Sequence, residues 1–481
     1  MAIGGDKTRM RRAFILGLDG ADWYFINKGL TKGILPNFEE IISNGASGTL
    51  ESLPPLTAPA WASITTGKDI RNHGIAGFSW LDFNYNVRMI SARDKKAKDM
   101  WEYVDKAIVI NVPVTYPVRK INGIIIGGML SPTLDKRSVY PSTEIKVLKD
   151  YGYVIEPEPH PKAIKESLDI RIEVAKHYFK RDWRLFFIVF REFDIMQHYF
   201  WDRSFSLYKK IDSFIGWLLD HIDSQTNLFV VSDHGFNRVD RVFVVENWLK
   251  EMGFLKLIED VKTESFLNTT ISKFYPMLVS LKIFADRLGV TKLSPIKNII
   301  HHLQSKGGYN IIDFSKTIVV YGYWGELFIN SKNRFREGFV DPIELPKIRE
   351  KLKNELLNYT DERGIKIISY VKTKNNLKVR YNTRKEPDVL FFVNSEQGYS
   401  GTPYFRYTNK VIIPAKTLRK EGEHTKNAIF IAYGPNIKKG FKLNKGRKLV
   451  DFAPTVLSVM GQNVSKSKFD GNIMHEIILK D

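Results

Sequence analysis

The chain has 481 residues, of which 43% are hydrophobic and 26% are charged, so it can bury one large core or two to three smaller ones, and a peptide, a fibrous repeat and a disordered tail are excluded. Lysine and arginine number 73 against 53 aspartates and glutamates, a net charge of +20, which favours polyanions, anionic membranes or small anionic substrates as partners. The absence of cysteine excludes disulfides, thiolate metal sites and a cysteine nucleophile, so any bound metal needs Asp, Glu or His ligands.

The N-terminal segment, residues 1–12, is short and basic and directly precedes the first apolar run, residues 13–18. A secretory signal needs an apolar stretch before its cleavage site, and here that stretch coincides with the first strand of the fold. We therefore expect a cytoplasmic protein. No run approaches the ~18 apolar residues needed to cross a bilayer, so a transmembrane segment is not expected.

Short apolar runs alternate with amphipathic stretches along the chain. Six of these runs are predicted to be strands buried on both faces, as is typical of a parallel sheet covered by helices: residues 13–18, 107–112, 123–126, 185–190, 228–231 and 428–432. Helices are predicted at residues 36–43, which begin with a proline, and at residues 204–223, which keep helical spacing. The alternation predicts an α/β fold with a largely parallel central sheet sandwiched by helices.

The sequence pattern changes after Trp248. Residues 256–315 are rich in lysine and helical in pattern, residues 317–393 mix strand-like and helix-like pieces, and strand-like apolarity resumes at Ala428. We therefore predict one α/β sheet domain formed by residues 1–255 and 411–481, with residues 256–410 inserted as an α+β cap. The cap aromatics Tyr321, Tyr323 and Trp324 would contact an organic part of the substrate or form the core of the cap itself.

Three of the predicted strands lead into an aspartate: Asp19, Asp194 and Asp233. The carboxyl ends of strands in an open α/β sheet form the ligand crevice, where three carboxylates cannot all stay ionised without cations. No lysine or arginine falls in a pattern that would pair with all three. Histidines do fall at ligand spacings, because His234 follows Asp233 and His198 lies one helical turn beyond Asp194. Taken singly, each aspartate is equally well explained as a turn or helix-cap residue.

A second cluster surrounds Thr57. Pro59 suits the first turn of a helix that begins near Thr57, so the hydroxyl group would share a helix N-terminus with free backbone N–H groups. This combination provides a nucleophile inside an anion site. The alternative is an ordinary N-cap threonine.

Together these features resemble the alkaline phosphatase superfamily, specifically its branch of type I phosphodiesterases and nucleotide pyrophosphatases. The resemblance rests on residues 17–23, 35–38, 56–61, 66–67, 73–75, 194–198, 232–236, 422–424 and 451–455, in the order of the family. It implies two divalent metal ions with two sets of ligands: Asp194, His198 and His424 for one ion, and Asp19, Asp233, His234 and the Thr57 oxygen for the other. His424 is identified by the resemblance alone.

The resemblance also implies a mechanism in which Thr57 attacks phosphorus and the resulting phosphothreonine is hydrolysed by water. Three histidine ligands favour Zn²⁺ over Mg²⁺ or Ca²⁺, with Mn²⁺ as the alternative. The expected partner is a small anionic phosphate ester.

One departure bears on the substrate. Where the pyrophosphatases place an asparagine amide on a phosphoryl oxygen, this chain has Phe78, and Trp61 and Trp80 lie nearby in sequence. We therefore expect an apolar cleft and a phosphodiester substrate. The alternatives are a phosphomutase or a phosphomonoesterase of the same superfamily, and a non-enzymatic basic protein that binds nucleic acid or anionic lipid, although the sequence contains no nucleic-acid-binding motif.

Overall fold

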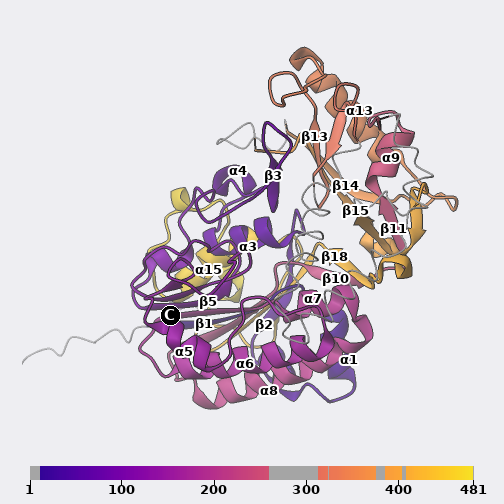
Figure 1. Ribbon diagram of the computed structural model, residues 1–481. Helices are drawn as coiled ribbons and strands as arrows, with labels where there is room; N and C mark the ends of the chain where they lie inside the picture. Colours follow the sequence, from indigo (N-terminus) through magenta and orange to yellow (C-terminus); the bar gives the residue numbers. More distant parts are fainter. Residues whose placement is uncertain (1–10, 259–311, 323, 375–384, 403–407, 480–481) are drawn as a thin grey trace, which may run out of the picture.

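The computed structural model describes residues 11–258, 312–322, 324–374, 385–402 and 408–479. It contains a large sheet below and a smaller sheet above it, connected by several short strands (Figure 1). Within the described ranges, no helix is both long and apolar enough to cross a membrane.

The large sheet has nine strands among the described residues. In spatial order these are β20 (Phe441–Lys442), β2 (Ala46–Glu51), β19 (Asn427–Tyr433), β9 (Thr226–Val231), β1 (Arg12–Leu18), β8 (Leu185–Phe190), β5 (Ala107–Val112), β6 (Gly123–Gly127) and β7 (Val139–Tyr140). All six strands predicted from the apolar runs are present. The predicted α/β class with a largely parallel central sheet is confirmed.

Strand direction follows the prediction at the centre of the sheet and departs from it at the edges. The five neighbours from β9 to β6 run parallel, with Gly17 opposite both Val189 and Val231. β19 is buried as predicted but runs antiparallel to β9, so the parallel direction inferred for it is wrong. A strand that is buried on both faces needs helices on both faces of its sheet. This burial does not determine whether the strand runs parallel or antiparallel to its neighbours.

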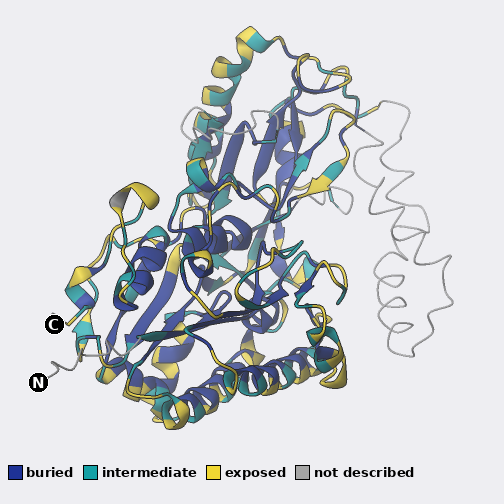
Figure 2. Ribbon diagram, turned by 90° about the vertical axis from the view of Figure 1, so that its left-hand side faces the viewer, coloured by how far each residue is buried: buried dark blue, intermediate teal, exposed yellow. Residues whose placement is uncertain are grey.

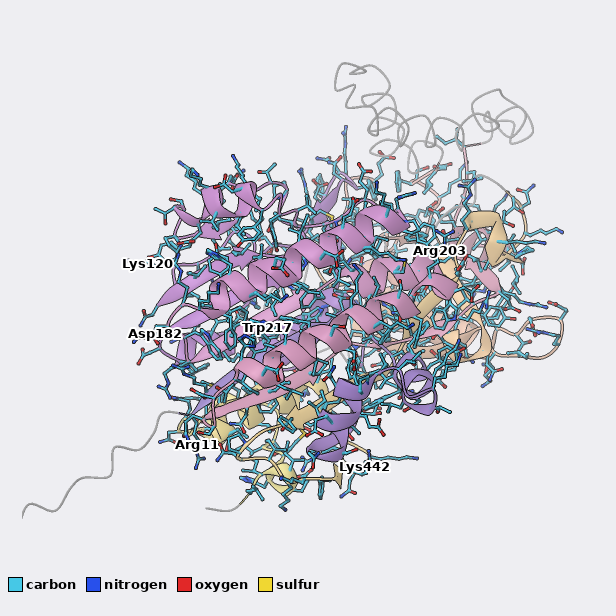
Figure 3. All side chains as sticks on the ribbon, turned by 90° about the horizontal axis from the view of Figure 1, so that it is seen from below. Arg11, Lys120, Asp182, Arg203, Trp217 and Lys442 are labelled. Atoms are coloured by element: carbon cyan, nitrogen blue, oxygen red, sulfur yellow. The ribbon has the colours of Figure 1, made fainter. Side chains whose placement is uncertain are left out.

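Helices cover both faces of the large sheet, because the buried side chains of each strand alternate between two cores. In β1, Phe14 and Leu16 belong to one core and Ala13 and Ile15 to the other. The first core lies under α1 (Trp23–Thr31), α2 (Pro36–Ser43), α5 (Glu144–Asp150), α6 (Pro161–Phe179) and α8 (Phe205–His221). Figure 3 shows this face, with Trp217 labelled on α8. The second core lies under α3 (Thr57–Thr66) and α15 (Phe452–Val459). The two predicted helices, at residues 36–43 and 204–223, correspond to α2 and α8.

The smaller sheet is antiparallel and forms, with one helix, the unit here called the cap. Its strands are β12 (Val319–Tyr321), β13 (Glu326–Ile329), β15 (Val389–Val393) and β14 (Ile368–Thr373), and α13 (Leu345–Asn358) packs against it. Figure 2 shows the buried strands of both sheets and the exposed outer faces of the helices. All four cap strands come from inside residues 256–410, and all nine described strands of the large sheet come from outside that range. The domain limits themselves stay a prediction, and most of the predicted lysine-rich helical part, residues 259–311, lies outside the described residues.

Short strands join the cap to the large sheet. β11 (Arg241–Val244) pairs with β16 (Tyr399–Thr402) and β17 (Ile412–Pro414), and β10 (Gly235–Arg238) pairs with β18 (Gly422–Thr425). Because β10 begins directly after residue 234, the pairing with β18 brings residue 424 to the carboxyl end of β9. This pairing joins parts of the chain almost 200 residues apart.

Candidate active site

The three aspartates predicted to converge lie at the carboxyl edge of three neighbouring strands. β1 stands between β8 and β9. Asp19 follows the last residue of β1, Asp233 lies two residues beyond β9, and Asp194 lies in the first turn of α7 (Glu192–Tyr199), which follows β8. The structure sorts the three carboxylates and the three predicted histidines into two groups of possible metal ligands.

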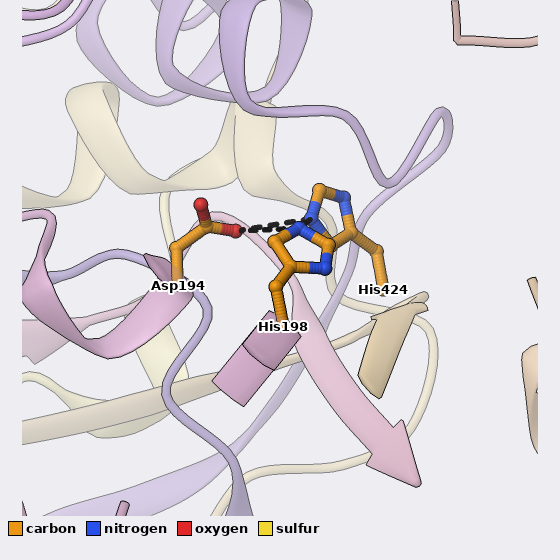
Figure 4. Close-up of side chains that lie close together, drawn as sticks. All are labelled: Asp194, His198 and His424. Atoms are coloured by element: carbon orange, nitrogen blue, oxygen red, sulfur yellow. Dashed lines mark hydrogen bonds and ion pairs between the residues drawn. The ribbon is translucent and has the colours of Figure 1, made fainter. Parts of the chain in front are cut away.

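The first group, here called the two-histidine group, consists of Asp194, His198 and His424 (Figure 4). The Nε2 atom of His424 lies 3.0 Å from Oδ1 of Asp194 and 3.0 Å from Nε2 of His198, and the latter lies 3.4 Å from the same Oδ1 atom. Ligand atoms around a tetrahedral Zn²⁺ with bonds of about 2.0 Å are about 3.3 Å apart. The three side chains therefore fit one such ion.

The second group, here called the two-aspartate group, consists of Asp19, Asp233 and His234, and all three side chains are fully buried. The Nε2 atom of His234 lies 3.2 Å from Oδ2 of Asp233, 3.8 Å from Oδ1 of Asp19 and 3.4 Å from the hydroxyl oxygen of Thr57. Oδ2 of Asp233 is buried and accepts no hydrogen bond, and the buried Oδ1 atom of Asp19 contacts the Arg191 guanidinium group. Since buried polar atoms are normally satisfied, the Asp233 oxygen in particular is suited to a cation.

All three histidines direct Nε2 toward the ligand groups and Nδ1 toward a backbone carbonyl oxygen. Nδ1 of His198 lies 3.0 Å from the carbonyl oxygen of Gly422, and Nδ1 of His424 lies 3.0 Å from that of Pro55. In His234 the corresponding partner is the carbonyl oxygen of Gly235 at 3.2 Å. A carbonyl oxygen only accepts, so each Nδ1 atom carries a hydrogen, and the other ring nitrogen, Nε2, faces its group as the atom that would bind a metal. This second contact is typical of histidines that bind metals.

The two groups differ in charge balance. Burial raises the pKa of Asp233 well above its usual range, and the neighbouring Asp19 carboxylate raises it further. Burial also raises the pKa of Asp19, against the lowering effect of Arg191. Burial alone would raise the pKa of Asp194 as well, but Arg191 and the two histidines outweigh it and hold that pKa well below its usual range. The two-aspartate group therefore has the greater need for a cation.

Arg191 is the site residue that sequence reasoning missed. Its Nη1 atom lies 3.1 Å from Oδ1 of Asp19 and 3.1 Å from Oδ2 of Asp194, so one buried guanidinium group ion-pairs with both ligand groups. Its Nε atom lies 3.3 Å from Glu156. The available signal was its position, since Arg191 directly follows β8 and thus enters the same crevice as the aspartates.

We expect the Arg191→Met variant to lower the free energy of unfolding of the metal-free protein by about 3 to 5 kcal/mol, because it leaves two buried carboxylates without their cation. Denaturant unfolding in the presence of a chelator measures this change. Arg238→Met is the matched control: Arg238 ion-pairs with Asp202 at the surface, so its loss should cost less than about 1 kcal/mol. Equal stability of Arg191→Met and the wild-type protein would contradict the role given to Arg191.

Thr57 is the first residue of α3 and is 2% exposed. The N-cap residue is Leu56, without a side-chain hydrogen bond, so the alternative of an N-cap threonine is not observed. The Thr57 hydroxyl faces His234 instead. One turn further along α3, Trp61 donates from Nε1 to Oδ2 of Asp19 at 2.9 Å, which fixes the helix against the two-aspartate group.

The cleft is apolar near the cap, but not through all the residues expected from the sequence. The centroid of the Phe78 ring lies 4.6 Å from the centroid of the Trp324 ring of the cap. Trp61, which was expected from the sequence to contribute to an apolar cleft, is fully buried beneath the site and packs on Phe187, so that part of the expectation is wrong: its ring is part of the core. Tyr323 lies outside the described residues.

A parallel sheet that ends in two ligand groups beside a helix-borne threonine defines a protein of the alkaline phosphatase superfamily. A family model for type I phosphodiesterase / nucleotide pyrophosphatase matches residues 13–399, and the chain belongs to this family.

Known relatives agree with this family. Mouse ectonucleotide pyrophosphatase/phosphodiesterase family member 7 is 22% identical over 252 residues, which cover 50% of this chain and 53% of the relative; the match thus spans about half the length of that protein. The structure of human ectonucleotide pyrophosphatase/phosphodiesterase 5 has a TM-score of 0.54 at 13% identity, and the comparison covers 98% of this chain and 100% of the other. The murine protein 5, solved as an inactive threonine-to-alanine variant in complex with AMP, has a TM-score of 0.53 at 14% identity with the same coverage. At these identities the structural likeness shows the fold alone.

Proposed function

We propose that this protein hydrolyses phosphate esters, more readily diesters, with two divalent metal ions and with Thr57 as the nucleophile. The observation that carries the proposal is the convergence of three histidine Nε2 atoms and three buried carboxylates on two points, one of them beside the Thr57 hydroxyl. The two-histidine group would hold one ion, and the two-aspartate group with the Thr57 oxygen would hold the other.

Three imidazoles among the ligands support Zn²⁺, with Mn²⁺ as the alternative, over ions that prefer only oxygen. Bound metals would lower the pKa of the Thr57 hydroxyl and offset the negative charge that develops on the phosphoryl and leaving oxygens.

The residues of the chain supply the rest of the reaction. The Thr57 oxygen forms a bond to phosphorus while the bond from phosphorus to the ester oxygen breaks, and the Thr57 proton ends on the released alcohol. Water then attacks the phosphothreonine, delivers its oxygen to phosphorus and restores the Thr57 hydroxyl. Trp61 and Arg191 keep the carboxylates beside Thr57 in place during both steps. The murine relative described as inactive after replacement of a threonine by alanine supports an essential threonine.

A diester preference is the expected result of an assay with matched p-nitrophenyl phosphate mono- and diesters at one pH and with one metal. A monoester brings an extra negative charge and a third non-bridging oxygen, which need polar donors. Phe78 cannot supply such donors, whereas its ring suits an uncharged second ester group that stays on phosphorus. We therefore expect a higher kcat/KM for the diester.

The same assay decides between the remaining alternatives. A tenfold or greater preference for the monoester would contradict the diesterase proposal and favour a phosphomonoesterase or a phosphomutase. Hydrolysis of neither ester in the presence of Zn²⁺ or Mn²⁺ would favour a non-enzymatic binding protein, although membership of a hydrolase family supports catalysis.

A further inference from the structure

A cavity of about 410 Å³ lies between the two-histidine group and the cap. Its size falls within the range of small-molecule sites. Its wall combines site residues with aromatic residues of the cap, among them His198, His424, Tyr321, Trp324, Phe391 and Phe392.

The cavity adjoins one ligand group and not the other. His198 and His424 form part of its wall, whereas Thr57 contacts His234 of the two-aspartate group. The His234 and His424 rings stack with centroids 3.6 Å apart, so the two groups are in direct contact. In an in-line displacement at phosphorus the entering and leaving oxygens are on opposite sides. With Thr57 as the entering group, the leaving group departs toward the two-histidine group and thus toward the cavity.

The charged side chains of the wall neutralise each other. Lys420 lies 2.7 Å from Oε2 of Glu423, and the same oxygen accepts a hydrogen bond from Ser400 at 2.7 Å. Most of the remaining wall consists of aromatic rings and aliphatic side chains. The cavity therefore favours an uncharged apolar occupant.

The backbone of the cap holds Trp324 at this cavity in an unusual conformation. Trp324 has a φ angle of 54°, in the left-handed region that large side chains rarely adopt, and the residue is 43% exposed. Gly325 follows with a φ angle of 84°, and a Cβ atom there would lie 2.1 Å from the carbonyl oxygen of Phe391. A strained residue with an exposed aromatic side chain beside a catalytic group is typical of a binding position.

We propose that this cavity binds the leaving alcohol of the substrate and that this alcohol carries an uncharged apolar group. The inference rests on the proposed function. It adds that specificity is set by the leaving alcohol and not by the ester group that stays on phosphorus. The apolar group is either an aromatic ring or an alkyl chain. The alcohol oxygen separates from phosphorus as the bond from phosphorus to Thr57 forms, and the alcohol then leaves as the protonated product.

The test uses the metal-loaded protein and three phosphodiesters that share a methyl ester on one side. The other side carries ethanol, hexan-1-ol or 2-phenylethanol, whose leaving oxygens are of similar basicity. We expect kcat/KM for the hexyl or the 2-phenylethyl diester to exceed that for the ethyl diester at least tenfold, and the better of the two identifies a chain or a ring. We also expect the larger alcohol and methyl phosphate as products.

Two variants connect the preference to the cavity. Trp324→Ala should reduce kcat/KM for the preferred diester at least tenfold and change that for the ethyl diester less than about twofold. Phe339→Ala is the control. Phe339 is an aromatic residue of the cap that is 49% exposed and does not line the cavity, so its replacement should change kcat/KM for neither diester.

Results that differ from these expectations distinguish a failure of the inference from a failure of the proposed function. Release of methanol with formation of the larger alkyl phosphate would place the apolar group on the retained side and overturn the inference. Equal kcat/KM for all three diesters would overturn it too, while the proposed hydrolysis would stand. Absence of hydrolysis of any of the three would instead contradict the proposed function.

Discussion

Replacement of Thr57 by alanine is expected to reduce kcat at least about a thousandfold, which corresponds to about 4 kcal/mol in the activation barrier. The hydroxyl is the only group that the Thr57 side chain offers to phosphorus, and its oxygen lies 3.4 Å from Nε2 of His234 in a buried site. Thr57→Ser keeps the hydroxyl at the first position of α3 and should retain part of the activity. Initial rates with a p-nitrophenyl diester measure both variants.

Thr65→Ala is the matched control for this experiment. Thr65 is buried in the same helix, and its hydroxyl bonds to the backbone oxygen of Ala62, so its loss should leave kcat nearly unchanged. Rapid acid quenching followed by mass spectrometry of the wild-type protein should detect phosphate on Thr57. Near-normal hydrolysis by Thr57→Ala would mean that water attacks phosphorus directly.

The parts of the site that could be predicted are those with a local signal. Apolar runs that end in Asp19, Asp194 and Asp233 mark both the strands and the edge at which they meet, because the carboxyl ends of parallel strands share one side of a sheet. The distance of four residues between Asp194 and His198 places both on one turn of α7. Pro59 marks the start of α3. Each of these signals lies within a few residues of the side chain that it identifies.

Other parts depend on contacts between distant segments, which leave no local signal. His424 reaches the site because β18 pairs with β10, where it lies opposite Phe236, and the sequence around it is chemically ordinary. The contact of Phe78 with Trp324 likewise depends on how the cap sits over the site. Arg191 had a local signal, but its two ion pairs needed the positions of two other strand ends.

Removal of the metal ions is expected to abolish hydrolysis, with a loss of kcat comparable to that of Thr57→Ala. Without cations, the raised pKa values of Asp19 and Asp233 mean that the two-aspartate group retains a proton, and the lowering of the Thr57 pKa that bound metals would supply is lost. Dialysis against a chelator followed by addition of Zn²⁺ or Mn²⁺ tests this, with recovery of activity as the expected result.

Single substitutions should then separate the two ions. The two groups share no ligand, so Asp233→Ala should empty mainly the two-aspartate site and His424→Ala mainly the two-histidine site, each lowering the metal content from two ions to about one per chain. His221→Ala is the control, because His221 is exposed on α8 and stacks on Trp217. Elemental analysis by mass spectrometry gives the content. An unchanged metal content in both Asp233→Ala and His424→Ala would refute the ligand assignment, since neither group could then be where the ions bind.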